Sequence, residues 1–237
     1  MATLAQDGAP RSITRLGRAG WLLIGSFVAG LLLILVQVVF YADLDTELVA
    51  RAVELGRRPP LEEYSQIQAR YAGPFLLELV RTLLLGLPPF ALLAAATVSL
   101  RQSLQAFRQP RLTDFAQWCA LGALVAWLAQ LYLDLSIKFG PERWLPGAAR
   151  FDLLYSPLAF ATAWFGLAAV ICAALALRHL GIAPRVAVAA VAVAVLLAVG
   201  NLVLAIISGF TVGLPPLVPL IPALMLGGGL VRARPPC

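Results

Sequence analysis

The sequence predicts an all-α, polytopic membrane protein with six transmembrane helices and a short helical hairpin between the first two. Two observations lead to this prediction. The chain has 237 residues, of which 61% are hydrophobic and only 13% are charged, whereas a soluble domain is about half apolar and about a quarter charged. The apolar residues also gather in runs long enough to cross a bilayer, since a spanning helix needs about 20 residues.

The first apolar run covers residues 21–41 and follows a basic stretch, residues 1–20, which contains three arginines. The run is longer than the apolar core of a signal peptide, and Phe40 disrupts a small-x-small cleavage site ending at Ala42. We therefore expect an uncleaved signal anchor, preceded by a short interfacial helix whose arginines reach lipid phosphates.

Residues 42–73 form the one sizeable hydrophilic segment. Asp45 or Thr46 is suited to cap a helix that Gly56 would end, and Pro60 is suited to the first turn of a second helix. The segment therefore predicts a helical hairpin outside the bilayer, which lies either on the membrane-embedded bundle or on a partner.

Five further apolar runs complete the expected six spans. They cover residues 74–100, 115–137, 154–177, 186–207 and 214–231. The intervening segments are a basic loop at 101–114, a loop at 138–153, a turn at 178–185 and a tail at 232–237. The run 214–231 contains four prolines, so it either spans or forms a broken, re-entrant helix, which is tolerated only where protein shields it or it lines a cavity.

The distribution of charge predicts the orientation. With the N-terminus inside, the inner side carries ten arginines and two acids, Asp7 and Asp114, whereas the outer side carries seven basic residues and eight acids. The ten inner arginines are Arg11, Arg15, Arg18, Arg101, Arg108, Arg111, Arg178, Arg185, Arg232 and Arg234. Because basic residues concentrate in cytoplasmic loops, we expect both termini in the cytoplasm and the chain in the plasma or inner membrane.

Strong polar residues recur at one depth of the expected spans. At about 1.5 Å per residue, they lie about 5–10 Å below the outer ends of four different helices. They are Gln37, Glu78, Arg81, Gln130, Asp134 and Asn201. Ionisable groups inside a membrane usually face the bundle interior, so these six residues are candidates for an interhelical polar network or a ligand site.

Two interpretations of this polar slab remain open. In the first, Glu78 and Arg81 form a pair within one helix near the interface, and Arg81 extends towards the headgroups. In the second, Arg81 binds Asp134 or Gln130 across helices, and the group lines a cavity that opens to the outside.

Two other features are candidates for mechanical or partner roles. Pro88 and Pro89 remove two backbone donors from the second span and predict a kink, either fixed or acting as a hinge. In the basic loop, Phe107 lies on an apolar face beside Arg101 and Arg108, a pattern that suits anionic lipid or a cytoplasmic partner.

Several chemistries are excluded by composition. His179 is the only histidine, and no zinc-type cluster, HExxH or phosphate-binding loop occurs. We therefore expect no metal, no cofactor and no catalytic residue. The net charge of +6 arises between apolar runs, so it indicates anionic lipid headgroups rather than nucleic acid.

The sequence thus favours a permease-like transport component with a polar cavity in the outer half of the bilayer. In its layout alone, the chain resembles small permease subunits of ATP-driven exporters, which implies a cytoplasmic ATPase on another chain or other membrane subunits as partners. Two alternatives remain: a non-catalytic subunit of a larger membrane complex, and a membrane-embedded enzyme that acts on lipid with Glu78 or Asp134 as base.

Overall fold

The computed structural model describes residues 9–56, 59–104, 110–139, 149–207 and 215–233, and these residues contain helices and no strand. Five helices are long and apolar enough to cross a membrane, as in a multi-pass membrane protein. The bounds of the elements are α1 (Ala9–Leu55), α2 (Leu61–Tyr71), α3 (Phe75–Arg81), η1 (Thr82–Gly86), α4 (Leu87–Leu104), α5 (Pro110–Lys138), α7 (Ala149–His179), α8 (Pro184–Ile207) and α9 (Leu220–Arg232).

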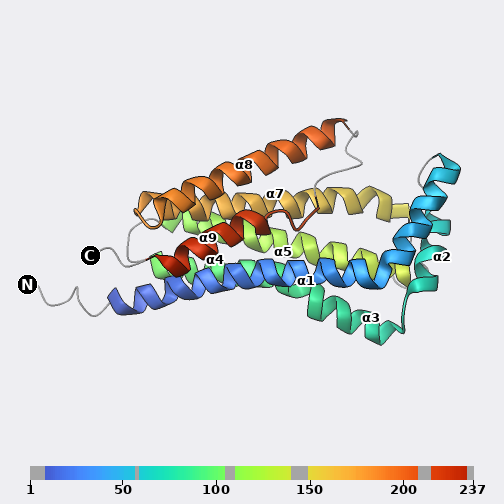
Figure 1. The fold of residues 1–237 in the computed structure, drawn as a ribbon, viewed down its shortest axis with the longest axis horizontal. Coiled ribbons are helices and arrows are strands. Elements are labelled where there is room, and N and C mark those ends of the chain that lie inside the picture. The colour runs from blue at the N-terminus through green and yellow to red at the C-terminus, as the bar shows by residue number, and fades with distance from the viewer. Residues whose placement is uncertain (1–8, 57–58, 105–109, 140–148, 208–214, 234–237) are drawn as a thin grey trace, which may run out of the picture.

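The long helices run roughly side by side, and the short helix α2 lies across one end of the bundle (Figure 1). We call this end the hairpin end, because α1 turns there towards α2. The opposite end carries most of the described arginines and is called the basic end. They are Arg11, Arg15, Arg18, Arg101, Arg111, Arg178, Arg185 and Arg232. Helix α9 ends at the basic end, where α1 begins (Figure 1).

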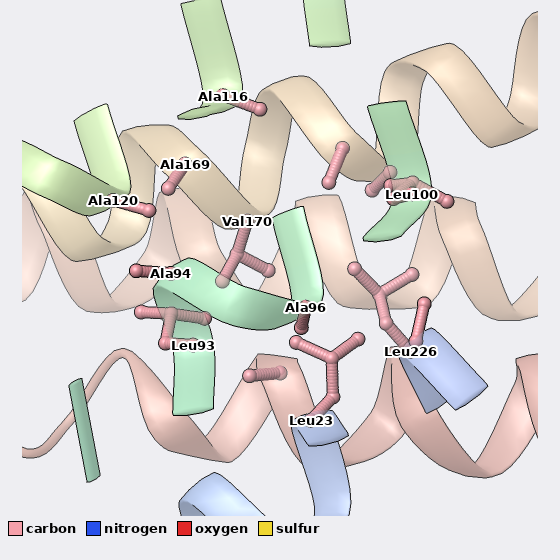
Figure 2. Close-up of a cluster of buried hydrophobic side chains, with 14 of the residues drawn as sticks. Leu23, Leu93, Ala94, Ala96, Leu100, Ala116, Ala120, Ala169, Val170 and Leu226 are labelled. Atoms are coloured by element: carbon pink, nitrogen blue, oxygen red, sulfur yellow. The ribbon is translucent and has the colours of Figure 1, made fainter. Parts of the chain in front are cut away.

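The core is built from small and branched aliphatic side chains of α1, α4, α5, α7 and α9 (Figure 2). Ala94, Ala96, Ala116, Ala120 and Ala169 are buried between helices. Lipid tails are as apolar as leucine, so helices in a membrane associate through close packing, which small residues permit. The alanines therefore bring α4, α5 and α7 together around Leu93 and Val170.

Helices α1 and α9 approach each other closely at two glycines. A methyl group placed on Gly227 would lie 2.8 Å from the carbonyl oxygen of Gly20, and one on Gly20 would lie 2.9 Å from that of Gly227. Glycine is required at both positions because the obstructing atom is backbone and cannot move aside. This pair holds α9 against the start of the first span.

Helix α9 is shorter than the span expected at 214–231. It has 13 residues, which at about 1.5 Å per residue reach about 20 Å, less than the hydrocarbon thickness of about 30 Å. Residues 216–219 form turns before it, because proline restricts the backbone and removes hydrogen-bond donors. The described residues thus contain five apolar helices of spanning length and a shorter sixth one, α9.

The hydrophilic segment folds as two helices that pair at the hairpin end. Helix α1 continues to Leu55 across a break at Tyr41, whose backbone is non-helical (φ −122°, ψ 15°). The arm after this break contacts α2 through ion pairs of Arg51 with Glu63 and of Arg70 with Glu47. Ile67 of α2 is buried against Tyr41 and the arm, so α2 covers the bundle end rather than projecting from it.

Candidate functional site

Glu78 is the centre of a buried charged cluster at the hairpin end. Its side chain is 2% exposed. Oε2 accepts hydrogen bonds from Arg81 and from the Tyr41 hydroxyl at 2.8 Å, and it lies 3.5 Å from Nζ of Lys138. Oε1 accepts the backbone N–H of Gly73 at 3.4 Å. Both oxygens are therefore engaged, and two cations compensate one carboxylate, as a buried charge requires.

Tyr41 connects the members of this cluster. Its hydroxyl donates to Glu78 and accepts from Nζ of Lys138 at 3.1 Å. The guanidinium of Arg81 lies 4.6 Å from the centre of its ring, and the ammonium of Lys138 lies 4.5 Å from it, within range of cation–π attraction. We call Tyr41, Glu78, Arg81 and Lys138 the Glu78 cluster; it joins α1, α3 and α5.

A polar pocket of about 210 Å³ lies beside the Glu78 cluster, between the arm of α1 and helices α2, α5 and α7. We call it the hairpin pocket. Its lining residues are Gln37, Tyr41, Leu44, Asp45, Tyr64, Gln68, Asp134, Lys138 and Tyr155. Among these residues Lys138 is the only cation, and it is already bound to Tyr41 and Glu78. Asp45 and Asp134 therefore leave the lining with an excess of negative charge.

A second, smaller pocket of about 40 Å³ lies between α1, the π-helical turn η1 and α5. We call it the inner pocket. It shares Gln37, Tyr41, Asp134 and Lys138 with the hairpin pocket. It also reaches Arg81, Thr82 and Gly86. The shared residues thus form a polar partition between the two pockets.

The π-helical turn at Thr82–Gly86 precedes the two prolines predicted to kink the second span, which lie in the first turn of α4. The indole N–H of Trp127 in α5 donates to the Gly86 carbonyl at 2.6 Å. The hydroxyl of Ser26 in α1 donates to the Pro89 carbonyl. Side chains of neighbouring helices thus satisfy backbone acceptors where the regular helical ladder is interrupted.

The structure brings together four of the six predicted polar residues. Glu78 and Arg81 pair within one helix, and Gln37 and Asp134 line both pockets. Within the described residues no ion pair joins Arg81 to Asp134. The cross-helix cation at Glu78 is Lys138 instead.

The other two predicted residues lie elsewhere. Gln130 is buried between α5 and α7, where its Oε1 accepts a hydrogen bond from the Thr162 hydroxyl at 3.3 Å. Asn201 is buried in α8, a helix that packs against α7 and α9. Neither residue lines the hairpin pocket or the inner pocket.

At the basic end, Arg101 contacts α5. Its Nε lies 2.5 Å from Asp114, and its Nη1 donates to Gln117 at 3.0 Å. Phe107 and Arg108, the other residues predicted to contact lipid or a partner, lie outside the described residues.

Sequence reasoning missed Tyr41 and Lys138. Tyr41 was placed at the interfacial end of the first span, and Lys138 was assigned to the following loop, whereas α5 includes it. One signal was present: Lys138 follows Asp134 by four residues, so the two share a helix face.

Comparison with known proteins finds no matching protein family, no similar curated protein and no similar solved structure. Within the described part of the chain, no group of three or more His, Cys, Asp or Glu side chains is arranged to hold a metal ion. The site must therefore be interpreted from its geometry and charge alone.

Proposed function

We propose that this chain is a permease-like transport component that admits a small polar solute at its hairpin end. The observation that supports this most directly is the shared lining of the two pockets. Four polar residues belong to both, and the inner pocket continues to the π-helical turn. A row of polar pockets at the level of an irregular helix is a common feature of solute paths through membranes, and π-helical turns are frequent at functional sites.

The proposal includes an orientation. The basic end faces the cytoplasm and the hairpin end faces outwards, in a plasma or inner membrane, because arginines concentrate on cytoplasmic sides. The short helix α9 completes the bundle at its cytoplasmic end. The hairpin pocket then opens towards the medium from which solute arrives.

The burial of Glu78 argues against the enzyme alternative that uses it as a base. A general base must lie within hydrogen-bond reach of the proton that it removes, but the Glu78 side chain is 2% exposed and lines neither the hairpin pocket nor the inner pocket. Glu78 is better explained as the residue that fixes Tyr41, Arg81 and Lys138 around the pockets.

The test uses the cells that make this protein, so that any ATPase or other subunit is present. Wild-type, Asp134→Asn and Asp43→Asn chains are compared at equal membrane abundance, and small solutes inside and outside the cells are quantified by mass spectrometry. Asp43 is a matched control, since it is an exposed acid at the hairpin end that does not line the pocket.

We expect Asp134→Asn to change the inside-to-outside ratio of at least one solute several-fold, and Asp43→Asn to leave all ratios unchanged. Unchanged ratios in cells that lack the chain altogether would overturn the transport proposal. A membrane complex that co-purifies with the wild-type chain would then support the subunit alternative.

A further inference from the structure

We infer that the hairpin pocket binds a small organic cation that carries a single ammonium group, with Asp134 as its counter-ion. This inference rests on the proposed function, because it names the class of solute that the same pocket would admit.

The first step concerns the cations near the pocket. Arg81 does not line the hairpin pocket and is bound to Glu78. Lys138 lines it, but its ammonium is bound to the Tyr41 hydroxyl and lies 3.5 Å from Glu78. Glu78, Asp45 and Asp134 outnumber the two cations Arg81 and Lys138 by one, so the charged groups at the pocket leave one net negative charge, which would repel a bound anion.

The second step concerns Asp134, which lies one helical turn before Lys138 on α5 and lines both pockets. It has no ion-pair partner within 4.0 Å among the residues that the structure describes. Lys138, the nearest cation on its helix face, is directed to Glu78. An ammonium group of a ligand would supply the missing partner, and hydrogen bonds between charged groups are the stronger ones.

The third step separates an organic cation from a metal ion. Calcium takes six to eight oxygen ligands, usually from several carboxylates. Only two carboxylates line the hairpin pocket, and no metal-type group occurs in the described residues. The remaining polar lining is amide and phenol: Gln37, Gln68, Tyr64 and Tyr155. Aromatic faces attract ammonium groups, so this lining suits an amine better than a metal.

The fourth step concerns size. The pocket volume of about 210 Å³ lies below the range of about 300–1,000 Å³ that is typical of drug-sized ligands. Tyr64 and Tyr155 pack against the buried pair Leu133 and Ile137, which fixes the walls. The ligand is therefore small, comparable with a short amino alcohol or its quaternary derivative.

The test measures equilibrium binding to the purified chain in lipid nanodiscs. Choline and ethanolamine are the cationic probes, and acetate and inorganic phosphate are the anionic controls. We expect saturable binding of at least one cation and of neither anion. We also expect Asp134→Asn to weaken cation binding about tenfold or more, as removal of a charged hydrogen-bond partner does, while Asp43→Asn has no effect.

Two further measurements keep the test decisive if Asp134→Asn folds poorly. Asp45→Asn changes an exposed residue at the pocket mouth and should weaken binding several-fold with normal folding. Lys138 is the only lysine in the chain, so acylation of its side chain by an amine-reactive ester can be mapped without ambiguity. Choline, which does not react with the ester, should slow this acylation in the wild type.

The inference is overturned if neither cation binds, if an anion binds in their place, or if both pocket variants bind as the wild type does. Its failure is distinct from failure of the proposed function. Solute ratios that respond to Asp134→Asn without cation binding would leave a transporter of another solute class. Cation binding without any change in solute ratios would leave a binding pocket that is not a transport site.

Discussion

Lys138 places its ammonium 3.5 Å from Oε2 of Glu78, across the contact between α5 and α3. Both side chains are largely buried, at 15% and 2% exposure. Since Arg81 also binds this carboxylate, two cations on different elements depend on one anion. The charge balance of the Glu78 cluster therefore depends on a single carboxylate.

Removal of the Glu78 charge should destabilise the bundle. In Glu78→Gln, Arg81 and Lys138 remain largely buried without an anion, and leaving a buried charge uncompensated costs about 3 kcal/mol. Unfolding in detergent, followed by circular dichroism, measures this loss. Glu54→Gln is the control, since it breaks an exposed pair with Arg51 and should cause no measurable change. Equal effects of the two substitutions would show that Glu78 is not the central anion.

The Trp127 indole should stabilise the π-helical turn. Trp127→Phe keeps an aromatic ring against Phe90 but leaves the Gly86 carbonyl without its side-chain donor. We expect a loss of about 1–2 kcal/mol in unfolding free energy and faster hydrogen exchange at residues 82–90. Trp118→Phe, at a lipid-facing position that is 72% exposed, should alter neither quantity. A Trp127→Phe chain with wild-type exchange would exclude this role.

Substitution of two neighbouring glycines of α9 by alanine should have different effects on stability. Gly227→Ala places a methyl group against the backbone of Gly20, so α9 must move away from α1, at a cost of about 1–3 kcal/mol typical of overpacking. Gly228 has nothing within 4 Å of the added methyl group. Gly228→Ala should therefore leave stability unchanged or raise it by up to about 1 kcal/mol through helix propensity. Unfolding midpoints of the two variants, measured side by side, test the α1–α9 contact.

We expect the stability of the hairpin to depend on pH through Tyr71. Its hydroxyl donates to Glu47 at 2.8 Å, and this hydrogen bond to a carboxylate raises the pKa of Tyr71 above its usual value of about 10. A raised folded-state pKa means that the contribution to stability is fully present below the unfolded pKa and is lost as pH rises through the folded pKa. The phenolate absorbance of the wild type minus that of Tyr71→Phe reports the titration.

Glu47→Gln should return the pKa of Tyr71 towards its usual value, because the charged acceptor is gone. Glu62→Gln, on the same hairpin but without this contact, should leave the titration in place. A difference titration that is the same in all three chains would contradict the Glu47–Tyr71 contact.

The sequence allowed the long helices to be located, since apolar run length and helix rise are fixed by bilayer thickness. It did not determine how α9 forms. Residues 214–231 are apolar enough for a span, but the regular helix begins only at Leu220, after three of the four prolines of this segment. An apolar segment can contain proline and still be predicted to span the membrane, whereas the length of its helix depends on the position of each proline.

The six polar residues show that depth in the membrane alone does not predict which side chains meet. Residue spacing gives each side chain a depth but not its direction around the bundle. Asn201 and Glu78 were assigned similar depths, yet α8 packs on α7 and α9, away from the Glu78 cluster. Glu78 and Arg81 were paired by their three-residue spacing, whereas Lys138 and Tyr41 join them through helix packing, which residue spacing does not report.

The contact between Gly20 and Gly227 has a consequence for biosynthesis. Helix α9 is translated after every other described helix, yet it packs against α1, which precedes them all. The face of α1 that packs against Leu220, Leu226 and Leu230 must therefore be exposed to lipid until α9 has been synthesised. The α1–α9 contact therefore closes only after all the other described helices have been made, and a chain truncated before residue 220 would leave that face of α1 without its partner.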